Sequence, residues 1–258
     1  LANPEPRYLT INADEGEVGT FKDRHYIETD PHRLLEGVLI SAKIINAKKA
    51  YIYLRDEYPT ALEILKKEIQ ELIKHKIVEK DYIIIQRGAG AYICGEESAM
   101  IESIEGKRGL PRHRPPFVAQ VGLFGKPTLV NNVETVYWLR DIIEKDSLWY
   151  SNQGKNNRKG FHSFSVSGRV KNPGVKVAPA GITVQELIDD YSGGMLDGHK
   201  FKAYLPGGAS GGILPASLNN IPLDYGVKEL EDEGCFLGSA AIVILSDQDK
   251  MKDVGLSL

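Results

Sequence analysis

Strand-like apolar runs alternate with helical patterns through roughly the first hundred residues, and this alternation constrains the fold more than any other feature. Residues 7–12, 50–54 and 82–85 read as strands, while 30–45 and 59–77 repeat apolar side chains at helical spacing. Asp30 and Pro31 suit the N-cap and first turn of the earlier helix. Strands that alternate with helices form parallel sheets with right-handed crossovers. The sequence therefore predicts an α/β domain with a parallel sheet over residues 1–150.

Acidic and basic residues nearly balance, with 35 Asp and Glu against 32 Lys and Arg, so overall charge suggests neither nucleic acid nor an anionic membrane as a partner. No apolar run approaches the roughly 20 residues of a membrane span. The first residues are neither a signal peptide nor a starting methionine, so we expect the chain to begin inside a longer protein. Cys94 and Cys235 cannot supply a disulfide framework or an iron–sulfur cluster, and a reducing, cytoplasmic setting is the default.

An acidic, glycine-punctuated loop at residues 13–20 follows the first strand and contains Asp14, Glu15 and Glu17. Its carboxylates repel one another unless donors lie nearby, and residues 21–24 could supply cations that hold the loop. One interpretation is a solvated surface turn. The other is a loop whose carboxylates accept hydrogen bonds from a ligand's hydroxyl or amide groups.

A glycine-rich loop at residues 88–97 follows the third strand and precedes a helical pattern. Glycines between a strand and a helix let backbone N–H groups approach an anion, but they are also common in plain turns. Tyr92, Glu96 and Glu97 add an aromatic ring and two carboxylates at the expected helix start. Ligands of parallel sheets sit beyond the carboxyl ends of the strands, so the acidic loop and this loop are predicted to share one edge.

Two further segments extend this region. Residues 106–117 form a basic, proline-rich stretch that ends at Phe117, and prolines exclude regular structure there. Such a loop could contact a phosphate, contact a partner protein or simply be solvated. Asn131 and Asn132 precede a helical pattern, and one of them is expected to cap that helix.

The pattern of predicted elements changes from strand–helix alternation to mostly strands after a polar linker at residues 151–160. Strand-like runs at 161–170, 174–177, 201–205 and 240–245 surround a short helix whose start carries Thr183 and Glu186 in capping-box positions. This order predicts a β-grasp-like second domain over residues 161–248. The glycine loop 207–212 reads as a flexible turn, with close approach to a ligand or to the first domain as the alternative. Cys235 is expected to be a small buried residue.

Four motifs occur in a fixed order along the chain: residues 12–20 (NADEGEVGT), 88–97 (GAGAYICGEE), 107–117 (KRGLPRHRPPF) and 131–135 (NNVET). Together they resemble the NADH-binding flavoprotein subunit of respiratory complex I. The same family serves NAD-linked formate dehydrogenases and NAD-reducing or bifurcating hydrogenases. The second domain is similar to the family's ubiquitin-like, soluble-ligand-binding β-grasp domain.

The resemblance implies a Rossmann-like domain that holds FMN, with NADH stacked on the flavin so that hydride passes from nicotinamide to FMN. It implies that Glu17, Glu97 and Phe117 contact NADH, the aromatic by stacking and the carboxylates by accepting hydrogen bonds. No side chain need act as a general acid or base, because the cofactor carries the chemistry. By the same resemblance, the residues around FMN would be Asn12, Asp14, Glu15, Tyr92, Gly95, Glu96, Val130, Asn131, Asn132 and Thr135.

Two parts of the family pattern fall outside this sequence. A glycine-rich loop with a following lysine, which cradles the flavin phosphate in the family, would precede Leu1. A helical domain with a C-x-x-C-x-x-C motif and a 4Fe–4S cluster would follow Leu258, so residues 249–258 are expected to open a truncated C-terminal region. Because the phosphate loop supplies backbone donors and a lysine together, we expect this fragment by itself to bind flavin weakly or not at all.

The leading interpretation is the middle portion of an NADH:acceptor oxidoreductase subunit, inactive by itself. One alternative is a non-catalytic scaffold fragment that keeps the fold and subunit contacts without binding FMN. Another, which the four motifs disfavour, is an unrelated nucleotide-binding module with a β-grasp partner-binding domain. The implied partners are NADH, a thioredoxin-like 2Fe–2S subunit and iron–sulfur electron-transfer subunits. The implied location is cytoplasmic, or peripheral on the cytoplasmic face of a membrane complex.

Overall fold

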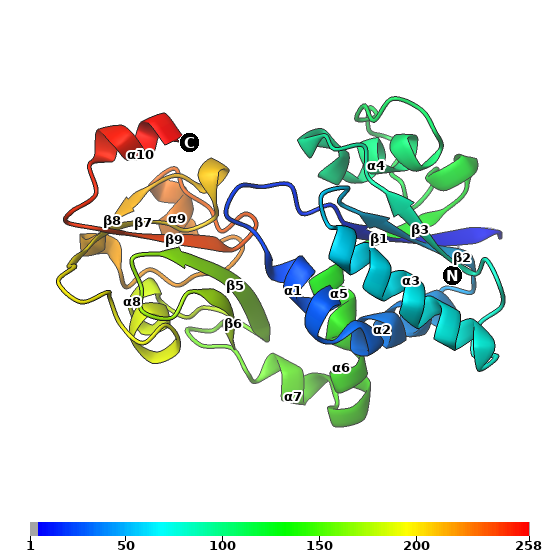
Figure 1. Cartoon of the computed structure of the whole chain (residues 1–258), viewed down its shortest axis with the longest axis horizontal. Coiled ribbons are helices and arrows are strands. Elements are labelled where there is room, and N and C mark those ends of the chain that lie inside the picture. Colours follow the sequence, from blue (N-terminus) through cyan, green and yellow to red (C-terminus); the bar gives the residue numbers. More distant parts are fainter. Residues whose placement is uncertain (1–4, 258) are drawn as a thin grey trace. The chain divides into compact units, whose positions relative to one another are not determined.

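The computed structural model describes residues 5–257, which fall into two units (Figure 1). The first unit comprises Asp23–Glu144 and the described residues up to Gly16. The second comprises Glu17–Lys22 and the described residues from Lys145 onward. The segment 17–22 therefore groups with the C-terminal part of the chain, although first-unit residues flank it in the sequence. The domain limits expected at residues 150, 160 and 248 stay predictions.

The first unit is built on a sheet of four parallel strands, counted among the described residues, in the order β3-β2-β1-β4. The strands are β1 (Arg7–Ala13), β2 (Ala47–Leu54), β3 (Ile83–Arg87) and β4 (Thr128–Asn132). Leu9, Ile11 and Ile52 are fully buried, as expected for strands that are covered on both faces. The parallel α/β sheet predicted from the strand–helix alternation is confirmed.

Helices cover both faces of this sheet (Figure 1). On one face, α2 (Pro31–Ile44), α3 (Pro59–Lys74) and α5 (Val133–Tyr137) pack on the sheet in one apolar core. On the other face, α4 (Glu97–Ile104) packs through Met100 and Ile101. Helices α1 (Lys22–Thr29) and α6 (Leu139–Lys145) lie at the sequence boundaries between the two units, and 3₁₀ turns occupy Tyr92–Gly95 and Leu123–Gly125.

The predicted helix starts in the first unit are confirmed. The side chain of Asp30 accepts the N–H of Arg33 at 3.2 Å, and Pro31 occupies the first turn of α2. Asn132 caps α5, because its Oδ1 accepts the N–H of Glu134 at 3.0 Å. These caps satisfy N–H groups that a helix cannot bond internally.

The second unit contains a mixed sheet of five strands among the described residues, in the order β6-β5-β9-β7-β8. The strands are β5 (Phe161–Gly168), β6 (Gly174–Pro179), β7 (Phe201–Leu205), β8 (Leu214–Pro215) and β9 (Ala241–Ser246). β5 and β6 form an antiparallel hairpin, and β9 returns parallel to β5 and antiparallel to β7. A hairpin, a helix and a central parallel return strand make up the expected β-grasp arrangement.

The helical elements of the second unit are short. They are α7 (Ser147–Ser151), α8 (Val184–Glu186), α9 (Lys228–Asp232) and α10 (Met251–Ser257), with a π turn at Leu187–Tyr191 and 3₁₀ turns at Ala209–Gly211 and Ala216–Leu218. The capping box at α8 is confirmed: Oγ1 of Thr183 accepts the N–H of Glu186, and Oε2 of Glu186 accepts the N–H of Thr183 at 2.9 Å. Cys235 is buried, as expected.

One segment differs from its sequence-based interpretation, and another forms a helix that was not predicted. Residues 22–24 begin helix α1. The glycine loop 207–212, expected to be a flexible turn, is packed tightly, because a Cβ on Gly207 would lie 2.3 Å from the carbonyl oxygen of Phe236. Gly207 therefore lets two backbone segments of the second unit approach closely.

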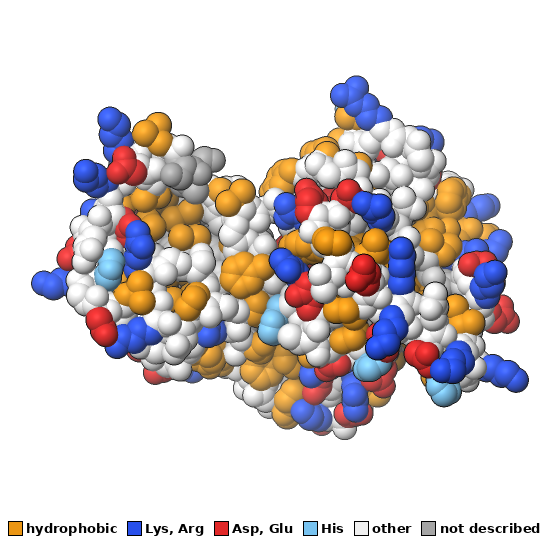
Figure 2. Space-filling view, viewed as in Figure 1, with side chains coloured by type: hydrophobic (Ala, Val, Ile, Leu, Met, Phe, Trp, Pro, Cys, Tyr) orange, Lys and Arg blue, Asp and Glu red, His pale blue; other side chains and the backbone are white. Residues whose placement is uncertain are grey.

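Acidic and basic side chains intermingle on the visible surface of the first unit, as Figure 2 shows. This mixture agrees with the near-balance of charge in the composition. Among residues 5–257, no helix combines the length and the apolar character that crossing a bilayer requires.

Candidate functional site

The candidate site lies at the carboxyl edge of the parallel sheet. β1 lies between β2 and β4, so the strand order reverses direction at the boundary between β1 and β4. Ligands of open α/β sheets bind beyond the carboxyl ends of the strands at such a reversal. Asn12 of β1 pairs in register with Asn132 of β4 at this position. The fold therefore points to one edge before any side chain is considered.

Asn12 joins the acidic loop to the glycine loop. Its Nδ2 donates to the carbonyl oxygen of Gly95 at 2.8 Å, and its Oδ1 accepts the N–H of Asp14 at 3.0 Å. A Cβ on Gly95 would lie 3.3 Å from the carbonyl oxygen of Asp14, so the two loops touch through backbone atoms. The structure thus brings together two loops that are about eighty residues apart in the sequence.

Asp14 carries an unused hydrogen-bond acceptor at this edge. Its Oδ2 is buried and has no hydrogen-bond partner among the described residues. Burial raises the pKa of Asp14 to about 6; Arg55 opposes this rise and Glu57 adds to it. A buried acceptor without a donor is costly to the fold and is the kind of group that a ligand can satisfy.

Glu15 has a different environment from Asp14. It is buried, its Oε1 accepts the N–H of Asp23 at 2.9 Å, and its Oε2 accepts the N–H of Arg24 and the hydroxyl of Tyr58 at 3.1 Å. Arg55 donates to the backbone oxygen of Glu15. The acidic loop is therefore no solvated turn. Residues 23 and 24 contribute backbone N–H donors to Glu15.

Glu96 and Glu97 lie at the start of α4. Oε2 of Glu96 accepts the N–H groups of Ser98 and Ala99 at 3.0 and 2.9 Å, which makes Glu96 the N-cap of the helix. Burial by itself would raise the pKa of Glu96, but these hydrogen bonds and the charge of Arg114 outweigh it and lower the pKa. Arg114 contacts Oε1 of both glutamates, at 2.8 Å for Glu97.

Two predicted site residues present aromatic rings to solvent. The Tyr92 residue is 65% exposed and Phe117 is 52% exposed, which is unusual for large apolar side chains in a folded unit. A Cβ on Gly16 would lie 3.3 Å from the Tyr92 ring, so this ring lies beside the acidic loop. Exposed planar rings at a polar edge are available for stacking on a flat ligand.

The β4 side of the edge carries four predicted residues: Val130, Asn131, Asn132 and Thr135. Nδ2 of Asn132 donates to the carbonyl oxygen of Asn12 at 3.3 Å and to Oδ2 of Asp23 at 2.7 Å. Val130 packs against the apolar cluster below α4, and Asn131 pairs with Ile11 in the sheet. Thr135 lies exposed in α5.

Glu17 is the one predicted site residue that belongs to the second unit. Its Oε1 accepts the N–H of Ser210 at 3.1 Å and also the hydroxyl of Ser210. The carboxylate of Glu17 therefore contacts the glycine loop 207–212 of its own unit. The other twelve predicted residues belong to the first unit.

Comparison with known proteins agrees with this geometry. A model of one protein family, described as the Nuo51 FMN-binding domain, matches residues 1–141, which is more than half of the chain. The chain belongs to the Nuo51 FMN-binding domain family. The resemblance that the four motifs suggested is confirmed.

Similar proteins extend the comparison over both units. An NADH-quinone oxidoreductase subunit of Rhizobium meliloti is 43% identical over 96% of this chain and 60% of its own length. An NADH-quinone oxidoreductase subunit of Aquifex aeolicus is 44% identical over 100% of this chain and 61% of its own length. A crystal structure of NAD⁺-reducing [NiFe]-hydrogenase superposes with a TM-score of 0.83 at 36% identity, covering 96% of this chain and 41% of that chain. The chain spans about 60% of the length of these curated Nuo51-family relatives.

Sequence reasoning did not identify three residues that hold the site of this Nuo51-family chain together, namely Arg55, Tyr58 and Arg112, nor Ser210, which holds Glu17 within the second unit. Arg55 directly follows β2. Because ligands bind beyond the carboxyl ends of parallel strands, a search of the residues after the second strand would have found it. Ser210 contacts Glu17 across almost two hundred positions of sequence, and no local pattern signals such a contact.

Proposed function

We propose that this chain binds FMN at the carboxyl edge of β1 and β4, binds NAD(H) beside it, and serves an NADH-oxidising flavoprotein. The observation that carries the proposal is the buried Oδ2 of Asp14, which lacks a partner among the described residues and lies where the strand order reverses. Membership of the Nuo51 FMN-binding domain family and the NADH-quinone oxidoreductase names of the relatives support it.

The residues at this edge fit FMN. A flavin and its ribityl chain bring N–H and O–H donors, and Oδ2 of Asp14 is an acceptor without one among the described residues. The glycine loop offers backbone close to Asp14, and Gly90 has a φ of +69° with nothing within 4 Å of an added Cβ. The exposed ring of Tyr92 offers a flat surface. We assign to the FMN surroundings Asn12, Asp14, Glu15, Tyr92, Gly95, Glu96, Val130, Asn131, Asn132 and Thr135.

We assign NADH contacts to Glu97, Phe117 and Glu17. Arg114 holds the Glu97 carboxylate at the start of α4, and half of Phe117 is exposed for stacking on a nucleotide ring. When bound, FMN supplies the redox chemistry, accepting a hydride from NADH and releasing electrons singly. The contribution of the chain is to bind and orient the two flat rings, so rate depends on geometry more than on a titrating side chain.

The finer parts of the proposal concern the whole protein. Electrons would pass from FMN to iron–sulfur centres, including a 4Fe–4S cluster in the full-length protein and a partner with a 2Fe–2S cluster. We propose a location on the cytoplasmic side of such a complex. The two NADH-quinone oxidoreductase relatives are named as subunits, which supports an assembly of several chains.

FMN binding by the full product of the gene tests the proposal. We expect stoichiometric FMN by absorbance, and we expect Asp14→Ala to weaken FMN binding about tenfold or more, because it removes a charged acceptor. Asp56→Ala is the matched control, since Asp56 follows β2 as Asp14 follows β1, but it is exposed and paired with Arg87. A full-length protein that purifies without flavin and does not take it up would contradict the proposal.

NADH oxidation with ferricyanide as acceptor tests the nucleotide contacts. Glu97→Gln is expected to raise the KM for NADH several-fold, since the charged acceptor becomes a neutral amide. FMN content should stay near that of the parent, because the recorded partner of the Glu97 carboxylate is Arg114 rather than a residue of the acidic loop. A KM for NADH that is unchanged by Glu97→Gln would count against the assignment of Glu97.

A further inference from the structure

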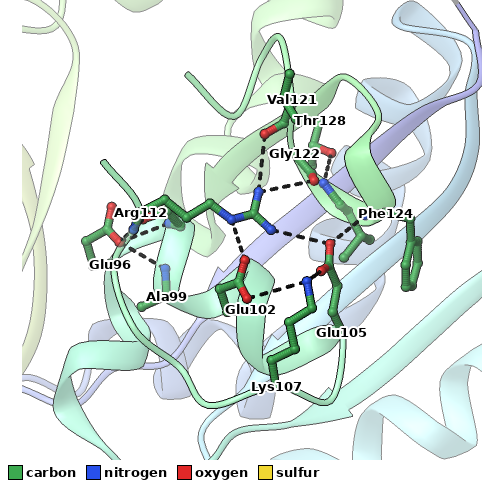
Figure 3. Close-up of polar contacts among 12 residues, drawn as sticks. Glu96, Ala99, Glu102, Glu105, Lys107, Arg112, Val121, Gly122, Phe124 and Thr128 are labelled. Carbon is green, nitrogen blue, oxygen red and sulfur yellow. Dashed lines mark hydrogen bonds and ion pairs between the residues drawn. The ribbon is translucent and has the colours of Figure 1, made fainter. Parts of the chain in front are cut away.

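The guanidinium of Arg112 joins two segments of the first unit, as Figure 3 shows. Its Nε donates to Oε1 of Glu102, and its Nη2 lies 3.4 Å from Oε1 of Glu105. Its Nη1 donates to the carbonyl oxygens of Val121 and Gly122 at 3.2 and 3.3 Å. One side chain thus connects the C-terminal end of α4 to the turn at residues 117–122, which we call the Phe117 turn.

The two carboxylates of this network are well suited to hold a cation. The Glu105 side chain is only 7% exposed, and its Oε1 also accepts the N–H of Phe124 at 2.6 Å. Burial alone would raise the pKa of Glu105, but the hydrogen bonds from Lys107 and Phe124 and the neighbouring cations lower it. The Arg112 side chain is 25% exposed, so its ion pairs are partly shielded from solvent and stronger than surface pairs.

The Phe117 turn is closed by its own hydrogen bonds. The carbonyl oxygen of Phe117 accepts the N–H groups of Gln120 and Val121 at 2.8 and 3.0 Å, and the N–H of Phe117 donates to Oε1 of Gln120 at 3.2 Å. Because Val121 and Gly122 also accept from Arg112, the guanidinium holds the whole turn rather than a single peptide. The backbone N–H of Arg112 donates to Oγ of Ser98 at 2.8 Å, near the start of α4.

Helix α4 therefore links the two groups that we assign to NADH. It begins at Glu97, and near its C-terminal end it presents Glu102 to Arg112, with Glu105 directly after it. Arg112 in turn holds the turn that carries Phe117. The Arg112 guanidinium is therefore the side chain that connects the helix bearing Glu97 to the turn bearing Phe117, in addition to the backbone bonds that join this turn to β4.

We propose that Arg112 is a positioning residue for the nicotinamide nucleotide: it fixes the Phe117 turn against α4 before NADH binds. This inference rests on the proposed function, because the roles of Glu97 and Phe117 come from there. A planar guanidinium has enough N–H donors in fixed directions to bond two carboxylates and two carbonyls at once. A lysine ammonium on a flexible side chain cannot reproduce that set of bonds. Without it the turn keeps its internal hydrogen bonds but loses this connection to α4, so its position must be fixed at the moment of binding, which weakens NADH binding and leaves the chemical step unchanged.

The test compares Arg112→Gln and Arg112→Lys with the parent in the full product of the gene. We expect the KM for NADH to rise roughly tenfold in Arg112→Gln and by an intermediate amount in Arg112→Lys. The kcat with ferricyanide and the FMN content should stay within about twofold, since Asn12 and Asp14 do not contact Arg112. A loss of kcat and FMN content along with the rise in KM would point to general misfolding and overturn the positioning role.

Lys107→Gln is the matched control. Lys107 contacts the same two carboxylates, Glu102 and Glu105, but its recorded ion pairs do not reach the Phe117 turn. The Lys107→Gln substitution removes one positive charge from the same network, and the KM for NADH should stay within about twofold of the parent.

Hydrogen exchange of the NADH-free protein gives a second, independent measurement. The amides of Val121 and Phe124 should exchange faster in Arg112→Gln than in the parent and in Lys107→Gln. A parent protein that does not oxidise NADH would contradict the proposed function. An active parent whose KM and amide exchange are unchanged by Arg112→Gln would overturn the positioning role alone.

Discussion

Three neighbouring carboxylates, Asp14, Glu15 and Glu17, have three different environments. Glu15 is buried and receives N–H and O–H donors, so its charge is compensated. Glu17 contacts Ser210 in the second unit. Asp14 is half-buried with one oxygen lacking a partner among the described residues, and its pKa is raised to about 6. Asp14 is thus the residue of this loop whose charge destabilises the fold, and its free oxygen is the acceptor on which the proposed FMN site depends.

The pH dependence of stability should reveal Asp14. Because its pKa is higher in the folded chain than the ordinary value of 3.8, the folded state binds this proton more tightly. Its contribution to the free energy of unfolding therefore falls as pH rises from about 4 through 6, and stays low above that range. Asp14→Asn should be more stable than the ligand-free parent at pH 7 to 8, by on the order of 1 kcal/mol once solvent screening is allowed for.

Urea unfolding of the FMN-free protein at pH 4, 6 and 8 measures this effect. The stability difference between Asp14→Asn and the parent should grow with pH. A difference that is constant over this range, or that shrinks toward pH 8, would show that the Asp14 carboxyl is not penalised by burial.

At the scale of elements, the close approach of α2 and α5 sets one side of the site. A Cβ on Gly37 of α2 would lie 1.9 Å from the carbonyl oxygen of Val136 in α5, which only a glycine avoids. Helix α5 starts at the capping residue Asn132, whose side chain also bonds the backbone of Asn12. The packing of the two helices therefore reaches the edge where the ligand is proposed to bind.

Gly37→Ala should destabilise the chain by about 1–3 kcal/mol, because α5 or α2 must move to admit the methyl group. Gly255→Ala is the control, since Gly255 lies in α10 with nothing within 4 Å of an added Cβ and alanine favours a helix. Chemical denaturation of both variants gives the comparison. Equal stability of Gly37→Ala and the parent would mean that the helices are not in close contact.

The elements show which patterns can be read from sequence. β1, β2, α2 and α3 were predictable because their apolar spacing is long and regular. Helix α1 was missed because its first turn contains Lys22 and Asp23, which look like solvated charges but are buried. The prediction that the acidic loop and the glycine loop share one edge was correct, because the carboxyl ends of parallel strands all lie at the same edge of a sheet.

Contacts between distant segments could not be predicted in this way. Arg112 reads as one of several cations in a basic loop, and only the folded chain shows its bonds to two carbonyls of the Phe117 turn. Glu15 accepts two backbone N–H groups from the start of a helix that was not predicted. Such bonds depend on the path of the folded backbone, which cannot be inferred from composition or from the spacing of apolar residues.

At the scale of the whole molecule, each unit has its own apolar core. In the first unit, Leu65 is fully buried among residues of α2, α3 and β2. In the second, Phe164 is fully buried in a core with Tyr204 and Ile242. Each unit therefore has the apolar core that it would need to open independently.

A pair of core substitutions tests this. Phe164→Ala should cost about 3–5 kcal/mol and lower amide protection mainly in β5, β7 and β9, whereas Leu65→Ala should cost about 2–5 kcal/mol and lower it mainly in β1, β2 and β3. Site-resolved hydrogen exchange of both variants distinguishes the outcomes. Equal loss of protection in both units from either substitution would show a single cooperative structure.

The short segment 17–22 limits how this protein can be divided. It leaves the first unit after Gly16 and returns at Asp23, and within the second unit Thr20 bonds Ser239 while the N–H of Phe21 bonds Ser165. A single break at residues 152–160 therefore does not yield two complete units, since the N-terminal fragment retains residues 17–22 of the second unit. After a protease cut there, the fragments should still co-elute in native gel filtration and separate only in denaturant. A gene fusion or recombination event that exchanged the second unit at one crossover would leave the acidic loop paired with a foreign partner.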